Sequence, residues 1–161
     1  GWTRLTTSGQ GFDTIGTVAP PAAFESFEMS EASIDADGEA LQTLTLRLSD
    51  AAAVDKIVFA INHNYHSENG RGFSGYFDVT TERCFESSRS RGNENIALQP
   101  GCVRRDNEDG SADFVVQFAA EPLFGDSTNN QVSAVWYEGG VNTYGWTRLT
   151  TSGQGFDTVV P

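Results

Sequence analysis

The chain has 161 residues and a formal net charge of −12, from ten basic and 22 acidic side chains. This length suits one domain with a hydrophobic core and is short for two. The negative charge argues against nucleic acid and anionic membranes as partners, because both would repel the chain. No run approaches the ~18 apolar residues that a membrane-spanning helix needs, and no signal peptide is visible.

The first element along the chain is repeated near its end. Residues 1–14 read GWTRLTTSGQGFDT, and residues 145–158 read the same fourteen letters, at an offset of 144 residues (145 − 1). Chance does not produce such a match. A piece of a tandem array that is cut slightly longer than one 144-residue unit would carry one segment at both ends. An engineered duplication of one strand is the alternative explanation.

A proline pair separates the first copy from the rest of the chain. Pro20 and Pro21, with small residues around them, are typical of an interdomain hinge. We therefore predict that residues 1–21 are the last strand of a preceding repeat plus a linker, and that residues 22–161 form the domain. Its first strand is expected over residues 22–38, ending in an Asp-Gly turn.

The next strands show clear hydrophobic periodicity. Leu44, Leu46 and Leu48 alternate with polar residues, which predicts a half-buried strand. Residues 53–62 are apolar on both faces and therefore predict a central strand. Residues 72–80 predict a further strand after an Asn-Gly turn.

Residues 83–111 are polar and contain the two cysteines, Cys84 and Cys102. Neither cysteine has the spacing of a zinc site. We expect a disulfide between them, which implies export from the cell, because polar residues surround both; two buried free thiols are the alternative. The segment is accordingly predicted to be a long loop pinned by the disulfide.

The last strands are expected over residues 112–120 and in a hairpin over residues 131–150, closed by a Gly-Gly turn. The final strand of the domain is placed at residues 145–158. About seven strands and no amphipathic helix predict an all-β fold, an antiparallel sandwich of two sheets.

The order of these segments resembles bacterial immunoglobulin-like (Ig-like) tandem repeats. The resemblance rests on residues 32–61 and 129–149, with Asp50 before an apolar strand and a closing hairpin, and it covers roughly residues 22–158. It implies an Ig-like sandwich and a role as a spacer or ligand carrier in large surface adhesins or other extracellular proteins.

The resemblance also suggests calcium as a cofactor. Acidic turns could supply oxygen ligands, although none matches a twelve-residue calcium loop. The candidate ligands at these turns and at the repeat junctions are Asp13, Asp35, Asp37 and Asp157. An ordinary Asp turn is the alternative at each position.

The polar segment around the cysteines is rich in arginine, and its arginines are candidate contacts to a neighbouring unit or to an anionic polysaccharide. These residues are Arg83, Arg89, Arg91, Arg104 and Arg105. Arginines that pair with nearby acids on a solvated loop are the alternative.

Other candidate sites favour a structural interpretation. His63 and His66 could bind a metal, but they lie in turn-forming sequence. Trp136, with the aromatic residues that follow it, could form a sugar-stacking platform, but its alternation places it in the core. No nucleophile constellation is visible, so an enzyme is not expected.

We therefore expect a non-catalytic repeat module of an exported adhesin stalk or filament, outside the cell or at its surface, whose partners are identical neighbouring repeats. A carbohydrate-binding module is the alternative. One sandwich has one place for the duplicated strand, so the surplus copy is expected to pair with a neighbouring unit. The apolar residues expected to carry this inter-unit strand are Trp2, Leu5, Phe12, Trp146, Leu149 and Phe156.

Overall fold

The computed structural model describes residues 22–62, 72–87, 95–142, 147–148 and 155–161. These residues form an all-β structure, as predicted, with two single-turn 3-10 helices, η1 (Ala51–Ala53) and η2 (Pro122–Phe124). None of the helices in this described part is long and apolar enough to span a bilayer.

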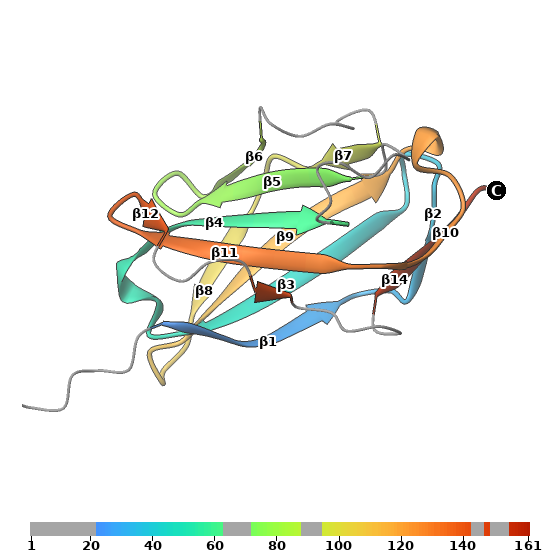
Figure 1. Ribbon diagram of the computed structural model, residues 1–161. Helices are drawn as coiled ribbons and strands as arrows, with labels where there is room; N and C mark the ends of the chain where they lie inside the picture. The colour runs from blue at the N-terminus through green and yellow to red at the C-terminus, as the bar shows by residue number, and fades with distance from the viewer. Residues whose placement is uncertain (1–21, 63–71, 88–94, 143–146, 149–154) are drawn as a thin grey trace, which may run out of the picture.

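Two antiparallel sheets form the body of the molecule, and their strands cross in Figure 1. The first sheet has the order β1 (Ala23–Met29), β3 (Leu41–Ser49), β9 (Ala112–Ala120), β7 (Ile96–Leu98), and β8 (Val103–Asp106) also pairs with β9. The second has the order β12 (Val141–Asn142), β11 (Val132–Glu138), β4 (Val54–Ile61), β5 (Phe73–Asp78), β6 (Arg83–Glu86), and β13 (Thr147–Arg148) pairs with β11.

A third, smaller sheet lies at one end of the molecule (Figure 1). In it, β14 (Phe156–Val159) lies between β10 (Ser127–Asn130), which is antiparallel to it, and β2 (Ser33–Asp35), which is parallel to it. The end of the chain is therefore held on both sides by backbone pairing.

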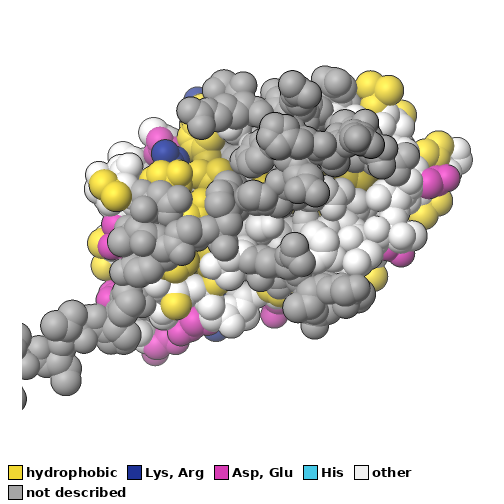
Figure 2. All heavy atoms as spheres, in the orientation of Figure 1, with side chains coloured by type: hydrophobic (Ala, Val, Ile, Leu, Met, Phe, Trp, Pro, Cys, Tyr) yellow, Lys and Arg dark blue, Asp and Glu magenta, His cyan; other side chains and the backbone are white. Residues whose placement is uncertain are grey.

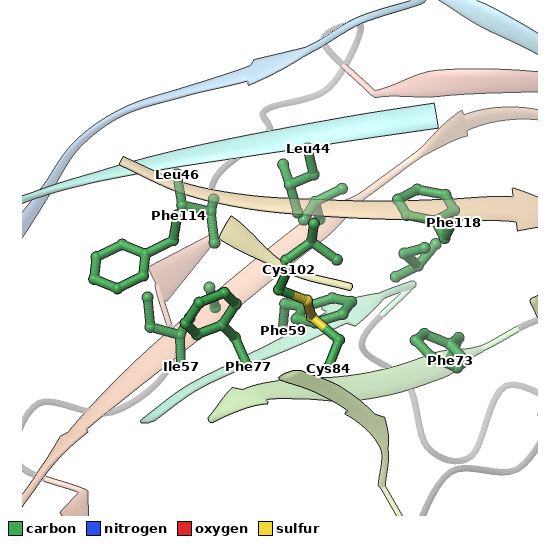
Figure 3. Close-up of a cluster of buried hydrophobic side chains, with 14 of the residues drawn as sticks. Leu44, Leu46, Ile57, Phe59, Phe73, Phe77, Cys84, Cys102, Phe114 and Phe118 are labelled. Carbon is green, nitrogen blue, oxygen red and sulfur yellow. A yellow bond between two sulfur atoms is a disulfide. The ribbon is translucent and has the colours of Figure 1, made fainter. Parts of the chain in front are cut away.

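The core lies between the two main sheets, where apolar side chains of both inner faces meet (Figure 3). The alternation predicted for β3 is confirmed, because Leu44, Leu46 and Leu48 are buried. The inward residues of β4 and β9 are buried as well, namely Ile57, Phe59, Ile61, Phe114, Val116 and Phe118. The Phe77 ring of β5 meets the Phe114 ring of β9 edge to face, with centroids 5.5 Å apart. Packing of one sheet on the other in this way makes the fold a β-sandwich. The central position of β4, between β11 and β5, is also as predicted.

Three segments differ from the prediction, and the fourteen strands of the described residues exceed the expected seven or so. Residues 83–111 were expected to form a loop but contain β6, β7 and β8. These strands are only three or four residues long and carry polar outward residues, so the segment has no run of alternating apolar residues.

The two ends of the domain are also divided between sheets. The predicted strand over residues 22–38 splits into β1 and β2, because the buried Gln42 side chain binds Ser30 Oγ (2.8 Å) and the Glu31 amide (3.0 Å) where the chain leaves the first sheet. Residues 145–158 were expected to be one last strand. Their described parts instead form β13, which pairs with β11, and most of β14, in the third sheet.

Candidate functional site

The end of the repeated segment is built into the fold. Phe156, the first residue of β14, is 1% exposed. Its ring centroid lies 5.7 Å from that of Phe118 in β9. Thr158 is also buried, and its hydroxyl donates a hydrogen bond to the Gly125 carbonyl (2.7 Å). The last residues of the repeated segment therefore occupy a specific place in the fold. We call it the terminal-strand slot, the space between β10 and β2 that β14 occupies.

Two asparagines at the end of β10 hold this strand in the slot. The Asn129 amide donates to Asp157 Oδ1 (2.7 Å), and Asn129 Oδ1 accepts from the Gly155 amide (3.0 Å). Asn130 Nδ2 donates to the Phe156 carbonyl (3.0 Å), while Asn130 Oδ1 accepts from Asn62 Nδ2 (2.9 Å). Asn130 is 1% exposed, so these bonds satisfy polar groups that would be costly to leave unpaired.

Gly155 lies at the start of the slot, where the backbone passes very close to β10. A Cβ atom at this position would lie 2.4 Å from the Asn130 carbonyl oxygen, which is a severe overlap. The slot therefore requires glycine followed by Phe156, the same order as in Gly11 and Phe12 of the first copy.

The sequence-based reasoning missed Asn129, Asn130 and Gly155 as the residues that receive the terminal strand. The available signal was the polar Asn-Asn-Gln triplet directly before an apolar strand. Of the six residues expected to carry the inter-unit strand, the structure describes only Phe156. The others lie outside the described residues: Trp2, Leu5, Phe12, Trp146 and Leu149.

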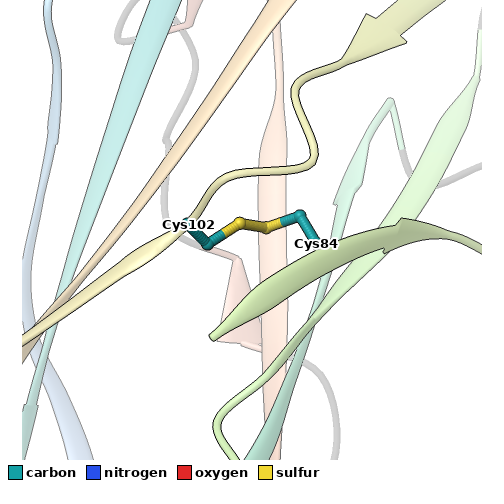
Figure 4. Close-up of a disulfide and its surroundings, with 2 residues drawn as sticks. All are labelled: Cys84 and Cys102. Atoms are coloured by element: carbon teal, nitrogen blue, oxygen red, sulfur yellow. A yellow bond between two sulfur atoms is a disulfide. The ribbon is translucent and has the colours of Figure 1, made fainter. Parts of the chain in front are cut away.

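The predicted disulfide between Cys84 and Cys102 is confirmed (Figure 4). Cys84 belongs to β6 of the second sheet, and Cys102 immediately precedes β8 of the first, with their Cα atoms 5.8 Å apart. The bond therefore joins the two sheets. Both cysteines are buried beside the aromatic residues of the core (Figure 3), although the neighbouring sequence is polar. A buried disulfide indicates folding in a non-reducing compartment.

The arginines near the disulfide have local partners. Arg104 Nε lies 2.7 Å from Asp106 Oδ1, and its guanidinium also lies over the Phe114 ring. Arg83 lies over the Phe85 ring, 5.6 Å from the centroid, and Arg105 stands opposite Asp113 in the backbone register of β8 and β9. Arg89 and Arg91 lie outside the described residues. Contact of the five arginines with an anion or a neighbour stays a prediction.

The candidate calcium ligands that the structure describes have different surroundings. Asp37 Oδ1 accepts hydrogen bonds from the amides of Ala40 and Glu39, which lower the pKa of this carboxyl. Asp157 Oδ1 is engaged by the Asn129 amide, and Asp35 is exposed at the end of β2. Within the described ranges no three His, Cys, Asp or Glu side chains form a group that could hold a metal ion. Asp13 lies outside these ranges.

Trp136 belongs to the core, as predicted: it is 4% exposed, and the Phe24 ring meets it edge to face at 5.1 Å. Next to it, on the other face of β11, Tyr137 is covered by Lys56 Nζ, which lies 4.2 Å from the ring centroid. Tyr76 and Phe85 stack on one another at 5.2 Å. Tyr144 and Trp146, the other aromatic residues of the predicted sugar-stacking platform, lie outside the described residues, so this alternative stays a prediction. His63 and His66 are outside the described residues.

Neither a protein-family model nor a curated protein sequence matches this chain.

Proposed function

We propose that the chain is a non-catalytic structural unit of an exported tandem-repeat protein, such as an adhesin stalk or an extracellular filament. The observation that carries this proposal is the identity of residues 1–14 and 145–158 at an offset of 144 residues. The structure adds that the end of the second copy is an integral part of the domain, since Phe156 is in the core. A sequence that every unit needs for its own core recurs once per unit in a tandem array.

The positions of the chain ends support the same proposal. Strand β1 begins at one end of the sandwich, beside η1 and β12, and β14 ends at the opposite end, beside β2 and β10 (Figure 1). We call these ends the N-terminal pole and the C-terminal pole. A unit whose chain enters at one pole and leaves at the other can be followed by an identical unit along the same direction.

The disulfide supports a location outside the cell or at its surface, because cytosolic thiols are normally kept reduced. The partners proposed for the unit are identical neighbouring units, and an Ig-like classification of the sandwich is part of this proposal.

The terminal-strand slot also supports strand exchange between units. Residues 11–14 have the same letters as residues 155–158, which occupy the slot, so the first copy of one chain carries the side chains that the slot of another chain accepts. Exchange that proceeds head to tail does not close and grows into a filament.

Deletion of residues 1–14 tests this proposal. The shortened chain should remain folded, because residues 155–158 fill its own slot, and it should be monomeric at concentrations where the full chain associates. Circular dichroism and analytical ultracentrifugation of both chains would show this. If the shortened chain unfolds, the first copy is the domain's own strand and the proposed division into units is wrong.

A further inference from the structure

Exposed aliphatic side chains gather at the C-terminal pole. Leu123 of η2 is 70% exposed, and Val159 and Val160 are 47% and 46% exposed. Hydrogen bonds fix these two segments side by side: Thr158 Oγ1 binds the Gly125 carbonyl, and the Val160 amide binds Asp126 Oδ1, each at 2.7 Å. The last strand and η2 therefore expose aliphatic side chains at the same end of the molecule.

The N-terminal pole has a similar surface. Ala52 and Ala53 of η1 are exposed, and Val141, directly after the Gly-Gly turn, is 62% exposed. The Gly140 amide donates to Asp55 Oδ2 (2.7 Å), which holds the tip of this hairpin next to η1. Figure 2 shows hydrophobic side chains exposed at both ends of the molecule.

The repeat brings these two surfaces close together. With an offset of 144 residues, Pro161 corresponds to position 17, so only the four residues equivalent to Val18–Pro21 separate it from the Ala22 of the next unit. Five Cα–Cα steps span at most roughly 18 Å. The C-terminal pole of one unit and the N-terminal pole of the next are therefore confined to a short distance.

We propose that consecutive units dock end to end, with Leu123, Val159 and Val160 of one unit packed against Ala52, Ala53 and Val141 of the next. This inference rests on the proposed tandem function and names the contact surface between units. A small interface suffices here, because a short tether gives an effective concentration on the order of millimolar. The docked poles remove from water the aliphatic surface that each unit exposes at its ends.

The test uses a two-unit protein in which residues 1–161 are followed by residues 18–161, which keeps the 144-residue offset. Leu123→Glu is placed in the first unit only, or Val141→Glu in the second unit only, so that each change lies at the internal junction. The matched controls carry the same substitutions in the opposite units, where they lie at the outer poles. Val103→Glu, at another exposed aliphatic residue, is a further control.

Small-angle scattering should show a sharp distance peak between units in the parent two-unit protein and in all controls. Either junction substitution should remove this peak, while the 161-residue chain with the same substitution keeps its melting temperature. A parent protein with no interunit peak, or junction variants that match their controls, would overturn the docking proposal. The tandem proposal fails separately, if the gene that encodes this chain contains no further 144-residue unit.

Discussion

At the scale of single residues, two kinds of contact stabilise the ends and the outer face of this sandwich. Phe156 fills the core from the last strand, beside Phe118. Arg47 on β3 and Asp113 on β9 form a bidentate salt bridge between neighbouring strands of the first sheet. Arg47 Nε donates to Asp113 Oδ1 (2.7 Å), and Arg47 Nη2 donates to Asp113 Oδ2 (3.0 Å). The first contact ties the repeated segment to the fold, and the second makes stability depend on pH.

Replacing Phe156 with alanine should lower the free energy of unfolding by about 3–5 kcal/mol, the usual cost of emptying a buried aromatic site. Phe12→Ala is the matched control, because it removes the equivalent side chain from the first copy of the repeated segment. It should change the free energy of unfolding by less than about 1 kcal/mol. Denaturant titration of both variants measures this difference. The reverse order of effects would show that the first copy occupies the slot.

The Arg47 guanidinium, mainly through its hydrogen bonds, holds the pKa of the Asp113 carboxyl below its ordinary value of 3.8. A carboxyl with a depressed pKa in the folded state stabilises the protein above its unfolded pKa, and this contribution is lost as pH falls through the folded pKa. Asp113→Asn should therefore be less stable than the parent at pH 7 and about equally stable well below pH 3.8. Thermal melts across this range measure the difference, and a difference that does not depend on pH would contradict the assignment.

At the scale of elements, periodicity predicted the long strands well. Strands β3 and β9 have nine residues each, enough for the alternation of buried and half-buried side chains to be visible in the sequence, and the eight residues of β4 were recognisable because they are apolar on both faces. The short strands of residues 83–111 escaped prediction because three or four residues do not establish a period. The terminal-strand slot escaped it because its geometry depends on long-range contacts, such as that of Gly155 with Asn130.

The disulfide between β6 and the segment before β8 should contribute about 3 kcal/mol, because it closes a loop with a sequence separation of 18 residues in the unfolded chain. Reduction should lower the melting temperature and leave the far-UV circular dichroism spectrum unchanged. The double variant Cys84→Ala and Cys102→Ala is the control, since reductant should not affect its melting curve. Equal melting temperatures of the parent with and without reductant would refute this expectation.

At the scale of the whole molecule, the net charge of −12 works against the compact state, because acidic side chains repel one another over the surface. Salt shortens the range of this repulsion, with a Debye length of about 30 Å at 0.01 M and about 3 Å at 1 M. Whole-molecule charge therefore predicts a stability that depends on ionic strength.

Raising sodium chloride from about 0.01 M to about 1 M should increase the melting temperature of the chain, because screening weakens the repulsion between its acids. A variant with Glu25→Gln and Glu28→Gln, two exposed residues of β1, should show a smaller increase. Calorimetric scans at several salt concentrations would measure both. A melting temperature that falls with salt would show that attractive ion pairs outweigh the net repulsion.

The position of the disulfide also determines how far one unit can stretch under mechanical load. In the proposed tandem array, a pull would enter each unit at the N-terminal pole and leave at the C-terminal pole. The Cys84–Cys102 bond closes a loop with a sequence separation of 18 residues, and this loop cannot extend while the bond is intact. This shortens the stretched length by roughly 60 Å, at about 3.4 Å per residue. If the proposed array forms, each fully extended oxidised unit is thus a shorter tether than its reduced form, and redox conditions would set the reach of the array under tension.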